Sequence, residues 1–449
     1  MLKERFIQQV KRSGLFDPGV PVFIARAPGR LDVMGGIADY CGSLVLQWPI
    51  AEATFAAVQA GRDPAIEIVS VGDLPRAYTL KLNDIALGYE EARALYSHRE
   101  DTHWVSYIAG IFMVLSRERN VSFSRGAKVF IASDVPQGKG VASSAALEVA
   151  VITAVCGAFD IHVEPQELAL LCQKAENLVA GAPCGVMDQM TSVCGESNCL
   201  LALLCQPAEL QPRVQVPDDI RFWGVDSGER HAVSGSDYST VRAAAFMGHR
   251  MIATDKTGWN GYLANITVEE FEQEWGHRLP DEISGDAFLA RYSGTTDSVT
   301  AVDPARIYRV RQATAHPVYE HDRVQKFRLL LTSPSTDLQR VRLGELMYRS
   351  HESYSACGLG SPGTDLIVNL VKAAGPAKGL YGARITGGGS VGTVAVIGSV
   401  DAKPALQEIV KNYADRTGYR PYLFSGSSAG ARQSGVMKVR LNEEKNFDE

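Results

Sequence analysis

Long apolar runs are absent from this chain of 449 residues, and its N-terminus, Met1-Leu-Lys-Glu-Arg-Phe, has no apolar core. No stretch approaches the ~18–20 apolar residues that a helix needs to cross a bilayer. A secretory leader would also need an apolar segment near its start. We therefore expect no membrane partner and a cytoplasmic location.

Closely spaced cysteine pairs are missing as well. The chain has eight cysteines, but none of them form a C-x-x-C pair. That spacing is typical of zinc sites, so we expect no zinc. Several cysteines lie in apolar runs such as Leu201 to Cys205, where a reduced thiol behaves as a small apolar side chain. Reduced cysteines agree with the cytoplasm.

The chain also has no excess of basic residues, since its formal net charge is −6. This charge offers no electrostatic basis for binding nucleic acid. With 45% hydrophobic and 21% charged residues, the composition is that of a soluble globular protein. The length is sufficient for two or three domains.

Secondary-structure patterns divide the chain into two halves. Strand-like runs come first, at about 22–25, 44–46, 53–58 and 66–70, and helical patterns follow at about 102–118, 144–158 and 166–181. A proline-containing connector at 206–212 ends this half, and the second half restarts with a strand at 220–226 and has helices at about 238–254 and 364–374. We predict an N-terminal domain over 1–210 and a C-terminal domain over 211–449. The latter carries an acidic, aromatic-containing elaboration at about 257–320.

The most informative segment runs from Asp134 to Glu148, between a strand-like run and a helix-like run. Its glycines and serines are Gly138, Gly140, Ser143 and Ser144. They stand where a helix begins, and free backbone N–H groups at that end attract anions. The segment is not a Walker A loop, because Gly140 follows Lys139 where that motif needs serine or threonine. It is either a phosphate-binding loop or an ordinary glycine-rich loop with a serine helix cap.

A second glycine-rich segment, residues 387–392, matches several motifs by spacing alone. A dinucleotide site would need a helix after it, but residues 393–397 have a strand pattern. A protein kinase would need H-R-D and D-F-G motifs, and neither occurs. We interpret Gly387, Gly388 and Gly389 as a tight turn between two strands, which either approaches a ligand closely or simply closes a hairpin.

Two further segments complete a recognisable set. Arg30 and Asp39 lie on one loop-rich stretch, Glu176 lies late in a helical pattern, and Gly185-Val-Met-Asp-Gln189 follows shortly after. In this order, together with both glycine-rich segments, they resemble the GHMP small-molecule kinases. The galactokinase branch fits best, because Pro183 to Met190, Ser236 to Tyr238 and Leu346 to His351 have counterparts there.

The resemblance implies a fold, a chemistry and a set of roles. It implies a ribosomal-protein-S5-like N-terminal α/β domain and a ferredoxin-like C-terminal α+β domain, with ATP and Mg²⁺ bound between them. Asp188 matches the catalytic base and Arg30 the arginine beside it, while Ser144 and Glu176 match the Mg²⁺ ligands. Sugar contacts are implied for Asp39, Gly185 and Tyr238, and ATP contacts for Trp104, Gly138, Gly140, Ser143, Ser144 and Gly387 to Gly389.

Taken one at a time, these residues also allow structural roles. Arg30 and Asp39 could form an ion pair, Glu176 could lie on a solvated helix face, and Asp188 could cap a helix.

The sugar loop departs from the galactokinase pattern. Galactokinases carry Gly-Glu-His-Thr-Asp-Tyr where this chain has Gly-Gly-Ile-Ala-Asp-Tyr at 35–40. Gly36 and Ile37 would leave the C6 hydroxyl of galactose without a polar partner. L-Arabinose has the same 2, 3 and 4 hydroxyl arrangement and hydrogen in place of that CH₂OH group. The substrate suggested is therefore L-arabinose.

Plant L-arabinokinases show a closer resemblance, limited to their kinase part. They share the loop at 29–40 and several stretches of the 257–320 elaboration, among them Gly261 to Ile266 and Ala301 to Pro304. The reaction implied is conversion of ATP and L-arabinose to ADP and β-L-arabinose 1-phosphate. The alternatives are a galactokinase, a kinase that also accepts a 6-deoxy sugar such as D-fucose, and a non-catalytic sensor of sugar and ATP. Oligomeric state is not implied.

Overall fold

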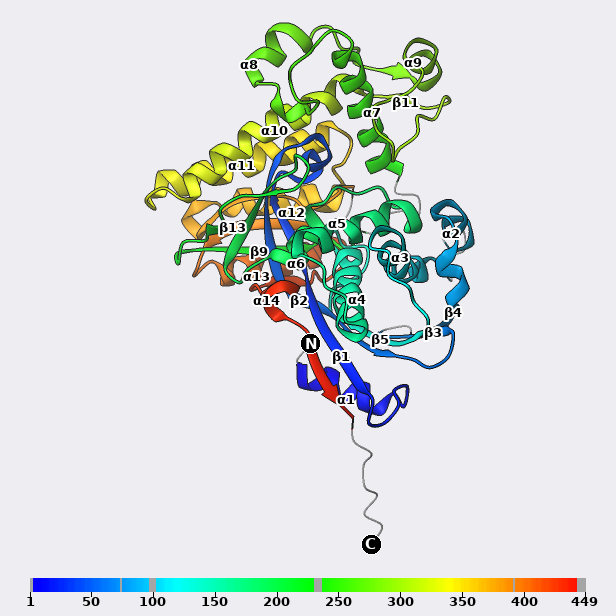
Figure 1. Ribbon diagram of the computed structural model, residues 1–449. Coiled ribbons are helices and arrows are strands. Elements are labelled where there is room, and N and C mark those ends of the chain that lie inside the picture. The colour runs from blue at the N-terminus through cyan, green and yellow to red at the C-terminus, as the bar shows by residue number, and fades with distance from the viewer. Residues whose placement is uncertain (1–2, 73–74, 97–101, 230–235, 391, 442–449) are drawn as a thin grey trace.

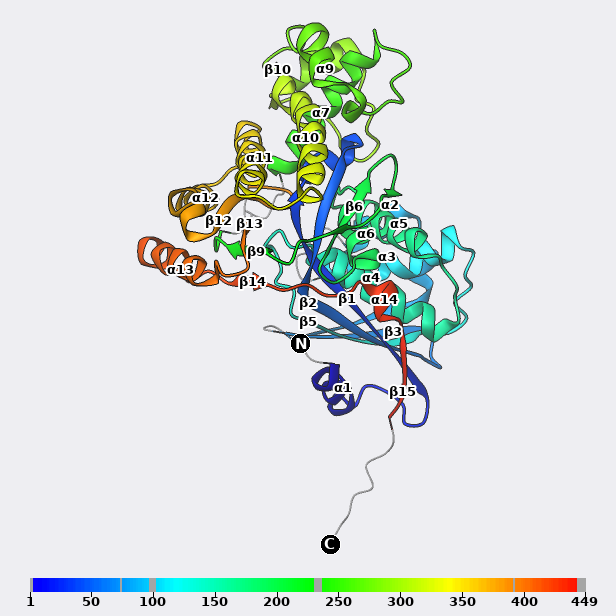
Figure 2. The same cartoon turned by 90° about the vertical axis from the view of Figure 1, so that its left-hand side faces the viewer.

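The computed structural model describes residues 3–441 except 73–74, 97–101, 230–235 and 391. Two sheets with their helices form the body of the molecule, and a smaller helical part lies at one end (Figures 1 and 2). Among the described residues, no helix combines the length and the apolar character needed to cross a bilayer.

The larger sheet has nine strands among the described residues, with the main order β15-β1-β2-β5-β3-β4 and with β6 joining β2, β7 and β8. Its strands are β1 (Pro21–Met34), β2 (Leu44–Ala60), β3 (Ala65–Val71), β4 (Arg76–Lys81), β5 (Ala127–Ser133), β6 (Cys199–Leu204), β7 (Glu209–Leu210), β8 (Val214–Gln215) and β15 (Met437–Arg440). All of these pairings are antiparallel except β3 with β5. Because β15 pairs with β1, the C-terminal strand returns to the sheet in which the chain begins.

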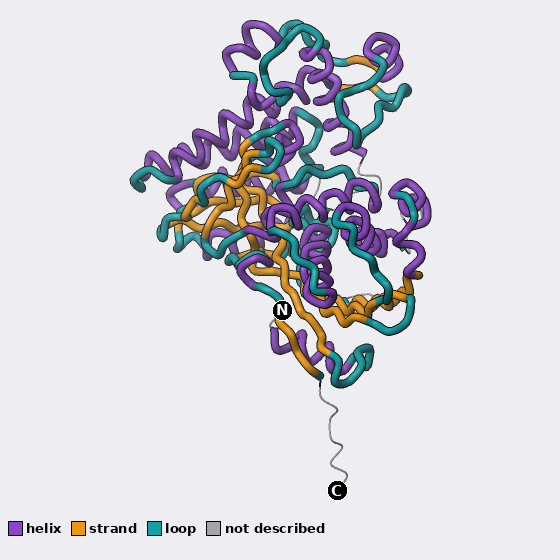
Figure 3. The backbone as a smooth tube through the Cα atoms, viewed as in Figure 1, coloured by secondary structure: helices purple, strands orange, loops and turns teal. Residues whose placement is uncertain are grey.

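Strands β1 and β2 are longer than the sequence patterns predict. The short runs expected at 22–25, 44–46 and 53–58 are parts of one long hairpin, which Figure 3 shows crossing the molecule. Arg30 therefore lies on a strand rather than on a loop, and only Asp39 lies in the connecting 3₁₀ helix η1 (Gly36–Cys41). The local pattern missed this because nearly all of β1 is buried on both faces, which removes the alternation of polar and apolar residues.

Helices cover the larger sheet and enclose its core. Those expected at about 102–118 and 144–158 are α3 (His103–Glu118) and α4 (Ser143–Phe159), and α4 packs on β1 and β2. The pattern at 166–181 is α5 (Pro165–Ala175) continued by a π-helical turn, η3 (Glu176–Ala180). The remaining helical elements of this part are α1 (Lys3–Arg12), η2 (Leu82–Ala86), α2 (Tyr89–Tyr96), α6 (Met187–Cys194) and α14 (Ala431–Ser434).

The second sheet has the order β12-β13-β9-β14 and is antiparallel throughout. Its strands are β9 (Ile220–Asp226), β12 (Leu380–Ile385), β13 (Thr393–Ser399) and β14 (Leu423–Ser425). Helices α11 (Asp337–Ala356), α12 (Pro362–Ala374) and α13 (Lys403–Thr417) accompany it, with the 3₁₀ turn η6 (Pro376–Lys378). The glycine-rich segment at 387–392 thus joins two paired strands, β12 and β13, which confirms the strand-turn-strand interpretation.

The two sheets share an apolar core. Leu31, Trp48, Phe222, Met347 and Phe424 belong to one buried cluster drawn from both halves of the chain. Since β1 and β2 contribute to this cluster, the residues between them are held at the junction of the two halves.

The elaboration expected at 257–320 is a small helical part whose apolar residues share one buried cluster with Ile37, Tyr354 and Ile385. Trp259, Phe271, Trp275, Phe288 and Tyr308 are buried together. Helix α7 (Ser236–Ala253) precedes the elaboration. The elements of the elaboration are η4 (Leu263–Asn265), α8 (Val268–Glu270), η5 (Phe271–Trp275), β10 (Ile283–Ser284), α9 (Gly285–Tyr292), β11 (Ile307–Tyr308) and the start of α10 (Val310–Leu331). Both α7 and α10 contact η1, so the elaboration rests on the loop that carries Asp39.

Candidate active site

The loop from Asp134 to Ala142 connects β5 to the first turn of α4. Gly138 and Gly140 have φ angles of 69° and 71°, and Ala142 is also left-handed with a φ of 59°. The helix cap is therefore Ala142, no side chain donates or accepts a cap hydrogen bond, and Ser143 is already helical. A serine cap, the structural alternative for this loop, is wrong. The first turn of a 17-residue helix keeps amides suited to an anion.

Arg30 and Asp188 form a two-point ion pair beside that helix. Arg30 Nε and Nη2 donate to the two carboxylate oxygens of Asp188 at 2.9 and 2.8 Å, and Nη1 donates to the Gly140 carbonyl at 2.6 Å. Arg30 is 3% exposed, whereas the Asp188 side chain keeps 20% of its surface. Asp188 lies in the first turn of α6 and makes no cap hydrogen bond. The pair thus leaves one carboxylate, already oriented, open to a ligand.

Glu176 is buried near Ser144 and does not lie on a solvated helix face. Its Oε2 accepts a hydrogen bond from Gln189 Nε2 at 2.6 Å, and the Ser144 hydroxyl lies close enough to lower its pKa. Burial raises the pKa of Glu176 to about 7, and the charge of Asp188 adds to the rise while Ser144 opposes it. A buried carboxylate of this kind is stabilised in its ionised form when a cation lies beside it.

Glu148 is a functional candidate that the sequence analysis left without a role. It is buried on α4 one turn after Ser144, and Gln189 Nε2 lies 3.4 Å from its Oε2. Burial and the neighbouring Glu176 raise its pKa well above the usual range. The available signal was an acidic residue inside the otherwise apolar helical run from Ala145 to Ala154.

The donor set of Ser144 and Glu176 fits Mg²⁺. Hydroxyl and carboxylate oxygens are the ligands that this ion takes, usually one or two from the protein with the rest from phosphates and water. Among the described residues, no three His, Cys, Asp or Glu side chains are arranged to hold a metal without further ligands. A Mg²⁺ ion here would therefore need phosphate oxygens to complete its shell.

Asp39 lies close enough to Asp188 for the two carboxylates to affect one another. It is buried, and its Oδ1 accepts a hydrogen bond from the Tyr40 amide at 2.6 Å. Gly185 packs directly on this carboxylate, since a Cβ there would lie 1.7 Å from Asp39 Oδ2. Burial raises the pKa of Asp39 to about 7; Asp188 adds to the rise and Arg242 opposes it. Asp39 and Gly185 are thus brought together, as the predicted sugar contacts require.

Gly36 and Ile37 are shaped by Tyr354. The Tyr354 hydroxyl accepts from the Ile37 amide at 2.7 Å and donates to the Gly387 carbonyl at 3.0 Å. A Cβ on Gly36, whose φ is 47°, would lie 1.6 Å from that hydroxyl. Ile37 is 2% exposed and belongs to the buried apolar cluster shared with the elaboration. Its side chain thus supports the loop from within the core.

The glycine-rich turn closes the site from the second sheet. A Cβ on Gly387 would lie 2.8 Å from the Gly140 carbonyl and 3.3 Å from Arg30 Nη2, and one on Gly388 would lie 3.3 Å from the Tyr238 ring. Tyr238 faces the Tyr40 ring edge-on, with centroids 6.0 Å apart. The turn therefore lies between the phosphate loop, Arg30 and Tyr238, which sequence order alone does not bring together.

A buried network holds the strand below the sugar loop, and the sequence analysis did not find it. Asp32 and Arg384 are both fully buried, with Arg384 Nη1 2.6 Å from Asp32 Oδ2. Asp32 Oδ1 accepts from the Gly36 amide at 3.0 Å, and the Asp32 amide donates to Thr386 Oγ1 at 2.6 Å. The network connects the sugar loop to β12, which supplies the glycine-rich turn.

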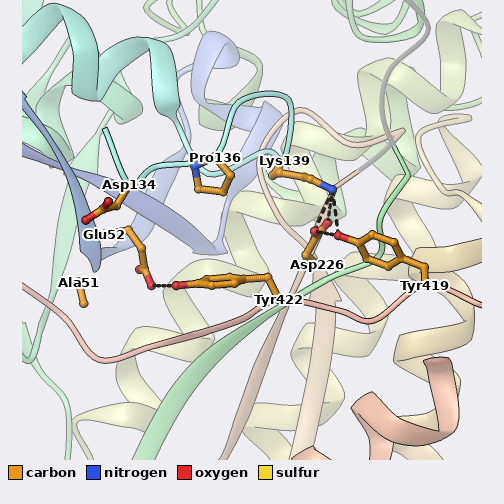
Figure 4. A pocket seen from close by; sticks show the side chains of 8 residues that line it. All are labelled: Ala51, Glu52, Asp134, Pro136, Lys139, Asp226, Tyr419 and Tyr422. Atoms are coloured by element: carbon orange, nitrogen blue, oxygen red, sulfur yellow. Dashed lines mark hydrogen bonds and ion pairs between the residues drawn. The ribbon is translucent and has the colours of Figure 1, made fainter. Parts of the chain in front are cut away.

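Trp104 and Lys139 have contacts outside the group of residues described above. Trp104 is half-buried on α3 and packs against the N-terminal core, so its contact with adenine stays a prediction. The Lys139 side chain is paired with Asp226, since its Nζ is 2.8 Å from Asp226 Oδ2. Figure 4 shows this ion pair in a cavity of about 540 Å³ that also contains Tyr419 and Tyr422. None of the predicted site residues lines this cavity.

Comparison with known proteins agrees with this geometry. Residues 106–196 match the N-terminal domain of GHMP kinases, and residues 14–60 match the galactokinase galactose-binding signature. An L-arabinokinase from Arabidopsis thaliana is 42% identical over 95% of this chain, which spans only 48% of that protein. A galactokinase from Chloroflexus aggregans is 31% identical over 89% of this chain and 90% of its own length.

Solved structures show the same fold. The galactokinase of Lactococcus lactis, crystallised with galactose, superposes with a TM-score of 0.76 at 20% identity, over 97% of this chain and all of its own. A mevalonate kinase superposes with a TM-score of 0.56 at 15% identity, over 90% and 99% of the two chains. The chain belongs to the GHMP kinase family, and it is a sugar kinase of the galactokinase branch.

Proposed function

We propose that this chain transfers the γ-phosphoryl group of ATP to the anomeric hydroxyl of L-arabinose, giving ADP and β-L-arabinose 1-phosphate. The observation that carries the choice of sugar is the absence of a polar side chain at positions 36 and 37. The Tyr354 hydroxyl fills the space beside Gly36. This hydroxyl already accepts a hydrogen bond from the Ile37 amide and donates one to the Gly387 carbonyl. A hydroxymethyl group buried there would have no partner for its hydroxyl, whereas the hydrogen of L-arabinose needs none.

Similarity supports the same choice. The Arabidopsis thaliana L-arabinokinase is 42% identical to this chain, against 31% for the Chloroflexus aggregans galactokinase. The 257–320 elaboration packs on the loop that carries Gly36 and Ile37. The elaboration and the altered loop therefore form one structural unit, which suits a change in substrate.

Asp188 is placed in this proposal as the group that takes the proton of the anomeric hydroxyl. As the sugar oxygen bonds to phosphorus and the bond from phosphorus to the ADP oxygen breaks, that proton passes to the carboxylate. Arg30 holds both oxygens of Asp188 and so fixes the direction in which they accept. Orientation of the nucleophile and the base is the larger part of such catalysis.

The ATP phosphates are placed at the first turn of α4, against Gly138, Gly140, Ser143 and Ser144. Ser144 and Glu176 would hold Mg²⁺, which neutralises phosphate charge when bound. Asp39, Gly185 and Tyr238 would bind the sugar hydroxyls, and Trp104 would line the adenine site. Gly387, Gly388 and Gly389 would close the site over Arg30. We retain a domain boundary near residue 210, and a cytoplasmic location agrees with eight unpaired cysteines, all in the described part of the chain.

The test is ADP release with Mg-ATP on L-arabinose, D-galactose, D-fucose and N-acetylgalactosamine. We expect kcat/KM for L-arabinose to exceed the others by about tenfold or more, the size of effect that one substrate group produces in a fitted pocket. A lead for galactose would leave the kinase in place and overturn the account of positions 36 and 37. That outcome is the galactokinase alternative, which the galactose-binding signature at 14–60 favours.

A further inference from the structure

Arg242 has an unusual set of contacts at the edge of the sugar site. It lies on α7 one turn after Tyr238 and is 5% exposed. Its Nε and Nη2 donate to Asp297 Oδ2 and Oδ1 at 2.9 and 3.1 Å, and its Nη1 donates to the Cys184 carbonyl at 3.2 Å. The guanidinium carbon lies 5.2 Å from the centre of the Tyr40 ring. One buried cation therefore joins three segments of the chain.

Two of these contacts, Tyr40 and Cys184, are next to predicted sugar contacts in the sequence, and a third predicted sugar contact lies on α7 itself. Tyr40 follows Asp39, Cys184 precedes Gly185, and Tyr238 lies on the same helix face as Arg242. Arg242 also opposes the rise in the pKa of Asp39, which agrees with their proximity. A shift of the guanidinium would thus displace the whole group of residues that faces the sugar.

Asp297 comes from the elaboration, between α9 and β11. Its carboxylate is held on the far side as well, because Oδ2 accepts from the Thr300 hydroxyl at 2.6 Å and from the Thr300 amide at 3.1 Å. Burial opposes ionisation, but the bonds to Arg242 and Thr300 lower the pKa of Asp297. The elaboration therefore presents one rigid, charged acceptor to Arg242.

We propose that Asp297 and Arg242 are positioning residues through which the elaboration fixes the geometry of the sugar site. Asp297 orients the guanidinium, and the guanidinium orients Tyr40, the Cys184 carbonyl and Tyr238. The elaboration then serves sugar recognition directly, although Asp297 touches no reacting atom. This inference rests on the proposed placement of the sugar at Asp39, Gly185 and Tyr238.

The test compares KM for the sugar with KM for ATP in Asp297→Asn and Arg242→Lys. Lysine keeps the charge but not the planar fork that serves Asp297 and Cys184 together. We expect KM for the sugar to rise about tenfold or more in both variants, since small displacements of binding groups cost that much. KM for ATP should stay within about twofold. The double variant should cost much less than the product of the two single effects, because the two residues act as a unit.

The matched control is Asp255→Asn, which breaks the exposed ion pair of Asp255 with Arg278 in the same elaboration. It should leave both KM values unchanged. If Asp297→Asn fails to fold, Thr300→Val removes one hydroxyl donor from Asp297 without touching Arg242, and a smaller rise in sugar KM is expected. Equal rises in both KM values, or a lower Tm with unchanged sugar KM, would overturn the proposal.

The sugar used is whichever one the unaltered chain phosphorylates best, so a preference for galactose ends the L-arabinose proposal without affecting this test. Calorimetric binding of L-arabinose and D-galactose to the full chain gives a second readout. Sugar affinity that falls in parallel in Asp297→Asn and Arg242→Lys supports the positioning role, and unchanged affinity contradicts it.

Discussion

The proposed phosphate side (residues 134–148 with Glu176) and the proposed sugar side (Asp39, Gly185 and Tyr238), called the phosphate side and the sugar side below, are built in different ways. The phosphate side comes mainly from one continuous segment, residues 134–148, and Glu176 is contributed by η3. The sugar side draws Asp39, Gly185 and Tyr238 from three separate segments, and Tyr354 from a fourth segment holds the loop that carries Asp39. The first needs correct local backbone conformation, whereas the second needs correct packing between distant parts of the chain.

The two sides also differ in how charge is balanced. Glu148 and Glu176 face each other on the phosphate side, and Gln189 is a neutral donor to both of them. On the sugar side, Asp32 and Asp297 are each paired with a buried arginine. The phosphate side therefore gains from a metal and cations that arrive with the substrate, while the scaffold of the sugar side is neutralised in advance.

The largest effect is expected where the two sides meet, at Asp188. Asp188→Asn keeps the shape but cannot take the proton, so kcat should fall by about 10²–10⁴-fold, as for other general bases. ATP affinity, measured by calorimetry, should change little because α4 and its loop are untouched. Near-full turnover in this variant would remove Asp188 from its role.

A second test disturbs the packing around Gly36 on the sugar side. Gly36→Ala places a Cβ 1.6 Å from the Tyr354 hydroxyl at a φ of 47°, so a loss of about 2–4 kcal/mol of stability is expected from overpacking and backbone strain. Gly258→Ala is the matched control, since Gly258 has a φ of 77° and no neighbour within 4 Å. It should cost about 1 kcal/mol from backbone strain alone. Thermal unfolding measures both, and equal losses would contradict the packing argument.

The pH dependence separates the two sides further. The pKa of Asp39 is raised to about 7, so the carboxylate is ionised above that pH and is protonated below it. Only the ionised form can accept hydrogen bonds from sugar hydroxyls with both oxygens. At saturating Mg-ATP, kcat/KM for the sugar should therefore fall as pH drops from about 8 to 6, approaching tenfold per unit below the pKa of Asp39. In Asp39→Asn, the residual kcat/KM should be flat over the same range.

The smallest effect is expected at an exposed ion pair. Arg278 and Asp255 are each about half exposed, and such pairs contribute about 0–1 kcal/mol. Asp255→Asn should therefore leave Tm almost unchanged, whereas Asp297→Asn should lower it clearly by leaving Arg242 buried without its partner. Comparable shifts in Tm would show that burial of the Arg242–Asp297 pair carries no special weight.

Sequence reasoning found the phosphate side more completely than the sugar side. The strand, loop and helix around Gly138 to Ser144 follow the predicted order, and Ser144 and Glu176 are in contact. It missed Glu148, which only burial distinguishes from a surface glutamate. It also treated Ile37 as a wall of the sugar pocket, whereas the side chain is buried against the elaboration.

The family, the kinase fold, the predicted phosphate loop and the residues of the expected chemistry could all be inferred from the amino-acid sequence. These inferences depend on short motifs, whose residues are close together both along the chain and in the folded structure. What fills the space beside Gly36, and how Asp297 reaches the proposed sugar site, became visible only in the folded molecule. Those contacts join residues from 55 to more than 300 positions apart, and no local pattern encodes which distant partner a buried charge will find.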